Sequence, residues 1–309
     1  MGATPGGVRG WLTDASYATG WAAVRALPEP AAAALFRRGG SVAARRDGRG
    51  VQRLRANLAR VAPDADLDAL LAAALQSYAR YWREVFRLPV TPLSRIVAGT
   101  ESVNDPRFRD AAAAGRGLVL ALTHSGNWDA AGAWAVATGV RFTTVAERLK
   151  PESLYDRFVA FRESVGMQVL PLTGGPRPSY DILVEQLAAG GNVALLADRD
   201  LTPRGVDVEF FGATARMPAG PAALALRTSS ALMPVSLSFR EDGWRLEFHP
   251  EVPHTDIATM TQQLADVFAK GIAASPQDWH MLQRLWLDDL APADPRRMAA
   301  DSSAAAGGP

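Results

Sequence analysis

The sequence of 309 residues contains no cysteine. This absence excludes disulfides, cysteine–zinc sites and a thioester intermediate carried by the protein itself. No stretch approaches the roughly 18 consecutive apolar residues that a membrane-spanning helix needs, and the first residues lack the apolar core of a signal peptide. We therefore expect no membrane-spanning helix, no secretory leader and no metal site.

The net charge is close to zero, but it is unevenly distributed. The total is +1, whereas residues 1–95 contain 14 arginines and 7 acidic residues, so the rest of the chain is acidic. The small total argues against a protein that binds nucleic acid. The basic cluster is either a solvated face or a surface that binds an anionic membrane. Its members are Arg37, Arg38, Arg45, Arg46, Arg49, Arg53, Arg55 and Arg60.

The chain is predicted to form one domain over 11–291, between loose tails at 1–10 and 292–309 that are rich in Gly, Ala, Pro and Ser. Residues 11–95 have helical spacing of Ala and Leu, with breaks that include Gly39-Gly40. Short apolar segments alternate with helical ones over 96–291, which predicts an α/β fold with a mostly parallel central sheet flanked by helices. The predicted strands are 117–123, 141–147, 167–172, 192–198, 231–240 and 244–250.

His124 directly follows the predicted strand 117–123, at the carboxyl end where open α/β sheets bind ligands. Asp129 lies beyond a Ser-Gly-Asn turn, in the first turn of a predicted helix, from which it could reach back to the imidazole. A carboxylate bonded to one ring nitrogen fixes the tautomer and makes the other nitrogen a better base. Alternatively, Asp129 only offsets the helix dipole. We interpret the remaining histidines as structural: His249 and His254 in a late loop, and His280 in a terminal helix.

The six residues HSGNWD at 124–129 fit the HX4D pattern of acyltransferases that modify glycerophosphate and glycolipids. The sequence resembles the late lipid A acyltransferase superfamily and, within it, the actinobacterial phosphatidylinositol mannoside acyltransferases. The similarity extends over blocks 77–89, 123–129, 145–158, 195–212, 216–235 and 278–289. Six blocks in the same order are far more specific than the short motif alone.

The resemblance implies transfer of a long acyl chain, of the palmitoyl type, from acyl-CoA to the 6-hydroxyl of a mannose of a phosphatidylinositol mannoside. It makes His124 the general base and Asp129 its partner, with no acyl-enzyme and no cofactor apart from acyl-CoA as co-substrate. It further implies a peripheral protein on the cytoplasmic face of the plasma membrane, in contact with its anionic surface. The substrate-binding residues expected from it are Glu147, Arg148, Asp198, Arg199 and Asp200.

These charged residues also have structural interpretations. Glu147 ends a predicted strand and could simply form an ion pair with Arg148. Arg199 could serve only to neutralise Asp198 and Asp200, which end another predicted strand. We nevertheless expect this cluster to point at the same edge of the sheet as the HX4D motif.

Two segments are candidates for lipid contact. Small and apolar residues over 218–235, with 217–220 as a rim, could line a tunnel for an acyl chain, or could form an ordinary buried helix and strand. Aromatic residues at 78, 81, 82 and 86 share one helix face. Such a face is usually core, although the flanking arginines also allow an interfacial helix.

Two other functions remain open at this point. The protein could acylate a different glycolipid, or it could be a non-catalytic protein that binds or transfers lipid. An α/β-hydrolase is disfavoured because no G-x-S-x-G motif occurs. A dinucleotide-dependent enzyme is disfavoured because Gly115-Arg-Gly117 precedes its strand instead of following it.

Overall fold

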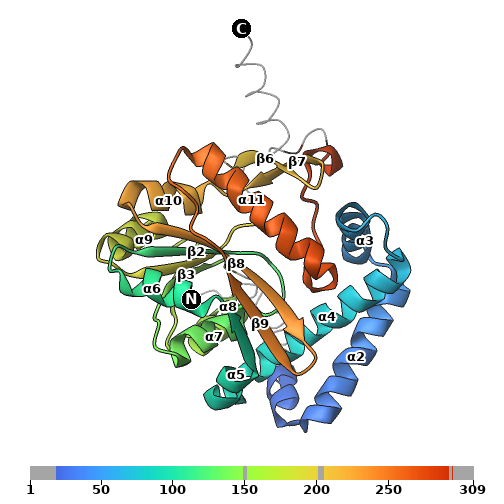
Figure 1. Cartoon of the computed structure of the whole chain (residues 1–309). Coiled ribbons are helices and arrows are strands. Elements are labelled where there is room, and N and C mark those ends of the chain that lie inside the picture. Colours follow the sequence, from blue (N-terminus) through green and yellow to red (C-terminus); the bar gives the residue numbers. More distant parts are fainter. Residues whose placement is uncertain (1–18, 149–151, 201–204, 292–293, 295–309) are drawn as a thin grey trace, which may run out of the picture.

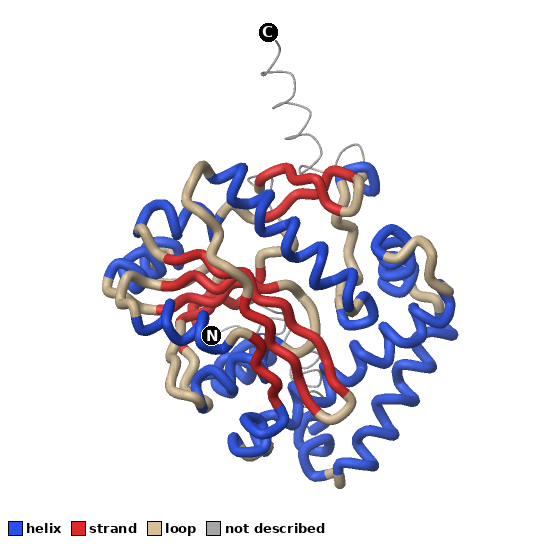
Figure 2. The backbone as a smooth tube through the Cα atoms, in the orientation of Figure 1, coloured by secondary structure: helices blue, strands red, loops and turns tan. Residues whose placement is uncertain are grey.

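The computed structural model describes residues 19–148, 152–200, 205–291 and 294, so the predicted tails fall outside it apart from Asp294. A seven-stranded sheet, in the order β1-β9-β8-β2-β5-β3-β4, forms the centre of the molecule (Figures 1 and 2). All neighbouring strands are parallel except β8 and β9, which confirms the α/β prediction. The strands are β1 (Thr100–Val103), β2 (Leu118–Leu122), β3 (Thr143–Ala146), β4 (Gln168–Pro171), β5 (Asn192–Leu196), β8 (Ala231–Arg240) and β9 (Gly243–Phe248).

All six predicted strands are present, and three further strands were not predicted. The edge strand β1 has the sequence TESV, whose polar residues carry no apolar signal. Strands β6 (Val206–Phe210) and β7 (Ala213–Met217) form a separate antiparallel pair. This hairpin packs against helix α11 (Ile257–Ala274) instead of joining the main sheet.

The basic N-terminal region is helical, and its helices lie together on one side of the molecule (Figure 1). It comprises helical residues 19–26, α2 (Glu29–Arg46), α3 (Arg49–Val61) and α4 (Leu67–Arg87). The break predicted at Gly39-Gly40 is wrong, because α2 runs straight through it. A Cβ atom at Gly40 would lie only 3.1 Å from the carbonyl oxygen of Leu75, so this glycine permits close packing of α2 on α4. Among the described helices, none is long and apolar enough to cross a bilayer.

The sheet separates two hydrophobic cores. Because side chains alternate along a strand, Val119 and Ala121 of β2 enter one core, whereas Leu120 and Leu122 enter the other. The first core is covered by α9 (Ser179–Ala188), α10 (Gly220–Thr228) and α11. The second is covered by α5 (Leu93–Gly99), α6 (Asp105–Ala113), α7 (Trp128–Ala137) and α8 (Glu152–Ser164).

Candidate active site

His124 and Asp198 meet at the carboxyl ends of two neighbouring parallel strands. Leu122 of β2 pairs with Leu196 of β5, and each site residue lies two positions beyond its strand's last paired residue. The imidazole Nδ1 lies 2.6 Å from Oδ1 of Asp198. The other carboxylate oxygen of Asp198, Oδ2, accepts hydrogen bonds from the backbone N–H of His124 at 3.0 Å and from the indole N–H of Trp279 at 2.9 Å. The carboxylate is therefore held on both oxygens.

The environment keeps Asp198 ionised although it is fully buried. Burial alone would raise the pKa of Asp198, but the facing His124 ring and the N–H donors around the carboxylate outweigh burial and lower it. An ionised carboxylate can only accept a hydrogen bond, so Nδ1 of His124 carries the proton. The Nε2 atom has no hydrogen-bond partner among the described residues and is left as the basic nitrogen, with the His124 side chain lining a cavity.

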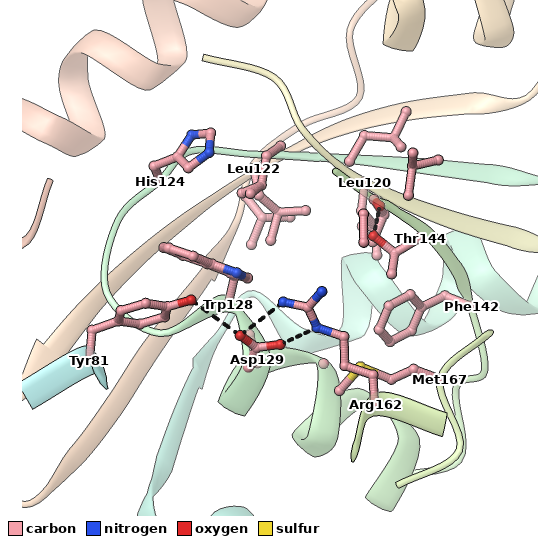
Figure 3. Close-up of a pocket in the computed structure, with 18 of the residues that line it drawn as sticks. Tyr81, Leu120, Leu122, His124, Trp128, Asp129, Phe142, Thr144, Arg162 and Met167 are labelled. Carbon is pink, nitrogen blue, oxygen red and sulfur yellow. Dashed lines mark hydrogen bonds and ion pairs between the residues drawn. The ribbon is translucent and has the colours of Figure 1, made fainter. Parts of the chain in front are cut away.

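Asp129 does not form the hydrogen bond to His124 that we predicted. Asn127 caps α7, and Asp129 follows in the first turn of that helix. One carboxylate oxygen of Asp129 accepts from Nε of Arg162 at 2.6 Å; the other accepts from Arg162 at 3.2 Å and from the Tyr81 hydroxyl at 3.3 Å. Figure 3 shows His124 apart from this cluster. The carboxylate that orients the imidazole is consequently Asp198, to which the sequence had assigned a substrate contact.

The Asp129–Arg162 ion pair is itself largely buried, with side-chain exposures of 2% and 16%. Burial would lower the pKa of Arg162, but the neighbouring Asp129 outweighs it and raises that pKa. Burial, together with the charge of Asp129, raises the pKa of Tyr81 well above its ordinary value. Asp129, Arg162 and Tyr81 thus form a hydrogen-bonded polar cluster in the wall of an otherwise apolar cavity.

The cavity that His124 lines has a volume of about 400 Å³ and extends between the sheet and helices α7 and α8 (Figure 3). Leu122 and Leu120 of β2 both line the cavity, with Leu120 further from the imidazole than Leu122. Leu120 precedes His124 by four positions of extended chain, which corresponds to about 13 Å. Its other apolar lining includes Phe108, Trp134, Phe142, Met167, Val235 and Phe248.

This cavity is not formed by the segment 218–235, for which an acyl tunnel was one of two interpretations. Helix α10 covers the opposite face of the sheet, and Met217 of the predicted rim is fully buried in that opposite core. Of the predicted segment 218–235, only Val235 lines the cavity. The segment fits the alternative interpretation, an ordinary buried helix and strand, because small residues permit close helix packing as readily as they leave open space.

The aromatic face of α4 contributes to the cavity. Tyr78, Tyr81 and Trp82 line it, and the Tyr81 ring packs 4.2 Å from that of Trp128, centroid to centroid. Phe86 instead packs against Trp82 and the N-terminal helical residues. The aromatic face of α4 is therefore cavity wall at Tyr78, Tyr81 and Trp82 and helix-packed core at Phe86.

The remaining predicted substrate-binding residues divide into two pairs. Glu147 and Arg199 line the cavity, and the buried Nε of Arg199 has no hydrogen-bond partner among the described residues. Arg148 instead forms an ion pair with Glu152 at 2.7 Å on the surface. Asp200 is buried and does not line the cavity. The structure thus brings only the first pair to the cavity.

His280 belongs to the site region, although we interpreted it as part of a terminal helix. The segment is extended there, since Trp279 forms an antiparallel bridge with Ser125. The backbone N–H of His280 donates to the carbonyl of His124 at 2.8 Å, and its ring lines the cavity. Burial, and then the charge of His124, lower the pKa of His280 to about 3. Its ring is therefore neutral and helps to hold the site in place.

A basic imidazole nitrogen in the wall of an apolar cavity is suited to activating a hydroxyl group next to a long-chain substrate. The sequence matches the family described as bacterial lipid A biosynthesis acyltransferase over residues 8–288. The chain belongs to this family and is an acyltransferase.

Two relatives in mycobacteria are named phosphatidylinositol mannoside acyltransferase. The protein of Mycolicibacterium smegmatis is 52% identical over 293 residues, which cover 93% of this chain and 95% of the relative. That of Mycobacterium tuberculosis (strain CDC 1551) is 52% identical over 290 residues, which cover 90% of each chain. This similarity spans the helical N-terminal region as well as the α/β core.

Proposed function

We propose that this protein transfers a long acyl chain, of the palmitoyl type, from acyl-CoA to the 6-hydroxyl of a mannose of a phosphatidylinositol mannoside. The observation that carries the proposal is the His124–Asp198 pair, whose imidazole lines the apolar cavity. The acceptor follows from the names of the mycobacterial relatives. The donor, acyl-CoA, is part of the proposal: its thioester is already activated, so no acyl-enzyme is needed, and the absence of cysteine agrees with this.

In the proposed reaction, Nε2 of His124 removes the proton of the mannose hydroxyl as its oxygen attacks the thioester carbonyl. Asp198 stabilises the imidazolium that forms, because its charge lies against Nδ1. The tetrahedral intermediate then collapses, the carbon–sulfur bond breaks, and the imidazolium returns the proton to the leaving thiolate of CoA. An ester is formed, the thioester is consumed, and neither an acyl-enzyme nor a further cofactor is required.

We assign the acyl chain to the cavity along β2. Its volume lies within the usual range of about 300–1,000 Å³ for small-molecule sites, and its lining is predominantly apolar. Asp129 remains in the proposal as the residue that holds Arg162 in the cavity wall. Glu147 and Arg199 are the charged groups placed to bind the polar parts of the substrates. We assign no substrate contact to Arg148 or Asp200.

The proposed lipid acceptor requires access to a membrane, and we place the protein peripherally on the cytoplasmic face. Helix α2 supports this location because it exposes Leu35 and Val42 on a helix that also exposes Arg38, Arg45 and Arg46. Exposed apolar and basic side chains on one helix are typical of interfacial binding. Two other members of the basic cluster have partners instead: Arg55 pairs with Asp68 at 2.6 Å, and Arg60 lies 3.7 Å from Asp289.

The proposal is tested by incubating the purified protein with palmitoyl-CoA and a panel of glycolipid acceptors, following CoA release and product mass. We expect CoA release that depends on phosphatidylinositol mannoside, and a product heavier by one acyl group. Transfer to a lipid A-type disaccharide instead would identify a different acceptor. Binding of these lipids without any transfer would contradict the enzymatic proposal and leave a lipid-binding protein.

A further inference from the structure

A second cavity, of about 360 Å³, lies on the other side of helix α8 from the active-site cavity. Tyr155 and Phe158 of α8 line the active-site cavity, whereas Arg157 and Phe161 of the same helix line the second one. Helical residues 19–26 provide its opposite wall. The second cavity is thus adjacent to the site but separate from the residues of the proposed reaction.

Two arginines line this cavity without an acidic partner. No aspartate or glutamate lines it, and neither Arg25 nor Arg157 forms an ion pair within the described structure. Arg25 is held in place, because its Nε donates to the carbonyl of Phe86 at 3.2 Å and its guanidinium lies over the ring of Trp21 at 5.1 Å. Its two Nη atoms have no partner among the described residues.

The two guanidinium groups influence each other electrostatically. Burial, and then the like charge of Arg157, lower the pKa of Arg25. Two like charges that face one cavity repel each other, and an anion between them would relieve that repulsion. Guanidinium groups match the geometry of phosphate oxygens particularly well. The charge arrangement is therefore complementary to a phosphate group.

The rest of the surroundings are apolar. Trp21, Pro89 and Phe161 complete much of the cavity wall. Val90 directly follows Pro89 and is 55% exposed, and Leu93, three residues further along the chain, is 42% exposed. Val97, four residues after Leu93 on α5, shares a helix face with it and is 38% exposed. Large apolar side chains close in sequence to a pair of arginines that is complementary to phosphate fit a phospholipid at the surface of a bilayer better than a phosphate in free solution.

We propose that Arg25 and Arg157 bind the phosphate of an anionic membrane phospholipid, while Val90, Leu93 and Val97 enter the adjacent interfacial zone. This lipid is distinct from the acceptor, and it fixes helix α8, and thereby the wall of the active-site cavity, at the membrane. The proposal rests on the proposed function only in that the protein works at a lipid surface.

The test measures vesicle binding by flotation, with phosphatidylcholine alone and with phosphatidylcholine mixed with phosphatidylinositol. The Arg25→Gln/Arg157→Gln variant should bind the anionic vesicles about thirtyfold more weakly, since each arginine near such a surface contributes about fivefold. The matched control is Arg141→Gln/Arg227→Gln, which removes the same charge from two exposed positions that line neither cavity, one just before β3 and one in the last turn of α10. The control should lose less than about threefold, because distant charges are screened.

The single variant Arg157→Gln provides a second test, since this exposed side chain has no hydrogen-bond or ion-pair partner within the described part of the chain. Its binding to anionic vesicles should weaken about fivefold. Calorimetric titration with inorganic phosphate distinguishes the source of the anion. Unchanged vesicle binding in both arginine variants, or an equal loss in the control, would overturn the proposal. Loss of phosphate binding with unchanged vesicle binding would also overturn it, in favour of a site for a soluble anion. Vesicle binding needs no turnover, so a failure of the proposed acyl transfer would be recorded separately.

Discussion

The replacement Asp198→Asn separates the two carboxylates of the site most clearly. Asn has the same shape as Asp but carries one oxygen and one NH2 group. In the structure, Oδ2 of Asp198 receives two N–H donors, from the backbone of His124 and from Trp279. These donors require an oxygen, so the amide NH2 must take the place of Oδ1, opposite Nδ1 of His124. There it can only donate, which forces the ring proton onto Nε2.

This change of tautomer removes the basic nitrogen from the cavity. We expect kcat to fall by about 10³–10⁴-fold, because general base catalysis and its orientation are lost together. This corresponds to about 4–5.5 kcal/mol in the activation free energy. KM should hardly change, since Asp198 is fully buried and does not line the cavity. The assay is steady-state CoA release, with the folded state verified by circular dichroism.

Asp129→Asn is the matched control. It alters the other buried carboxylate, which bonds to Arg162 and not to the imidazole. Nuclear magnetic resonance of the imidazole should show the Nδ1 proton in the wild-type protein and in Asp129→Asn, but not in Asp198→Asn. A wild-type kcat for Asp198→Asn, or loss of the Nδ1 proton in Asp129→Asn alone, would refute this assignment of roles.

Three further predictions concern the ion pair, the cavity and the buried histidine. Asp129→Asn should reduce the free energy of unfolding by about 3 kcal/mol in urea titrations, because it leaves the charge of the buried Arg162 uncompensated. The double variant Asp129→Leu/Arg162→Met should lose less of this free energy, and an equal loss in both variants would contradict this explanation. Ala194→Phe should place a ring at the level of Leu120 in the cavity and shorten the space for an acyl chain. The kcat/KM for long-chain acyl-CoA divided by that for short-chain acyl-CoA should then fall at least tenfold, the lower end of the effect of one methylene in an apolar pocket. An unchanged ratio would place the acyl chain elsewhere. The pKa of His280 is lowered from 6.5 to about 3 in the folded protein, so the unfolded chain takes up the proton first and stability falls as the pH drops below 6.5. Relative to His280→Phe, the free energy of unfolding of the wild-type protein should fall by about 2 kcal/mol between pH 7 and pH 5. Parallel plots of this free energy against pH for the two proteins would show that His280 does not titrate as described.

The sequence predicted the class of fold well because strand and helix patterns are local properties. The apolar segments of β2, β5 and β8 were recognisable by composition, whereas β1 was missed because TESV has no apolar pattern. Gly39-Gly40 was misinterpreted as a break, since the reason for a small residue there is the approach of α4, which is a tertiary contact.

The site was predicted only in part, for a related reason. His124 and Asp198 were both identified at strand ends, but their contact depends on β2 and β5 being neighbours with Leu122 opposite Leu196. Strand order cannot be obtained from one sequence, so the nearer Asp129 was chosen as the partner. Arg162 carried no signal at all, since it lies 33 residues from Asp129 in an ordinary helical segment.

The central claim is that His124 acts as the base in direct transfer from acyl-CoA to a glycolipid hydroxyl. It is tested most directly by comparing the wild-type protein and His124→Ala with palmitoyl-CoA and phosphatidylinositol mannoside, measuring CoA release together with the mass of the acylated product. We expect matching amounts of CoA and acylated lipid with the wild-type protein, and at least a hundredfold slower transfer by a folded His124→Ala variant. A variant that transfers the acyl chain at the wild-type rate would contradict it.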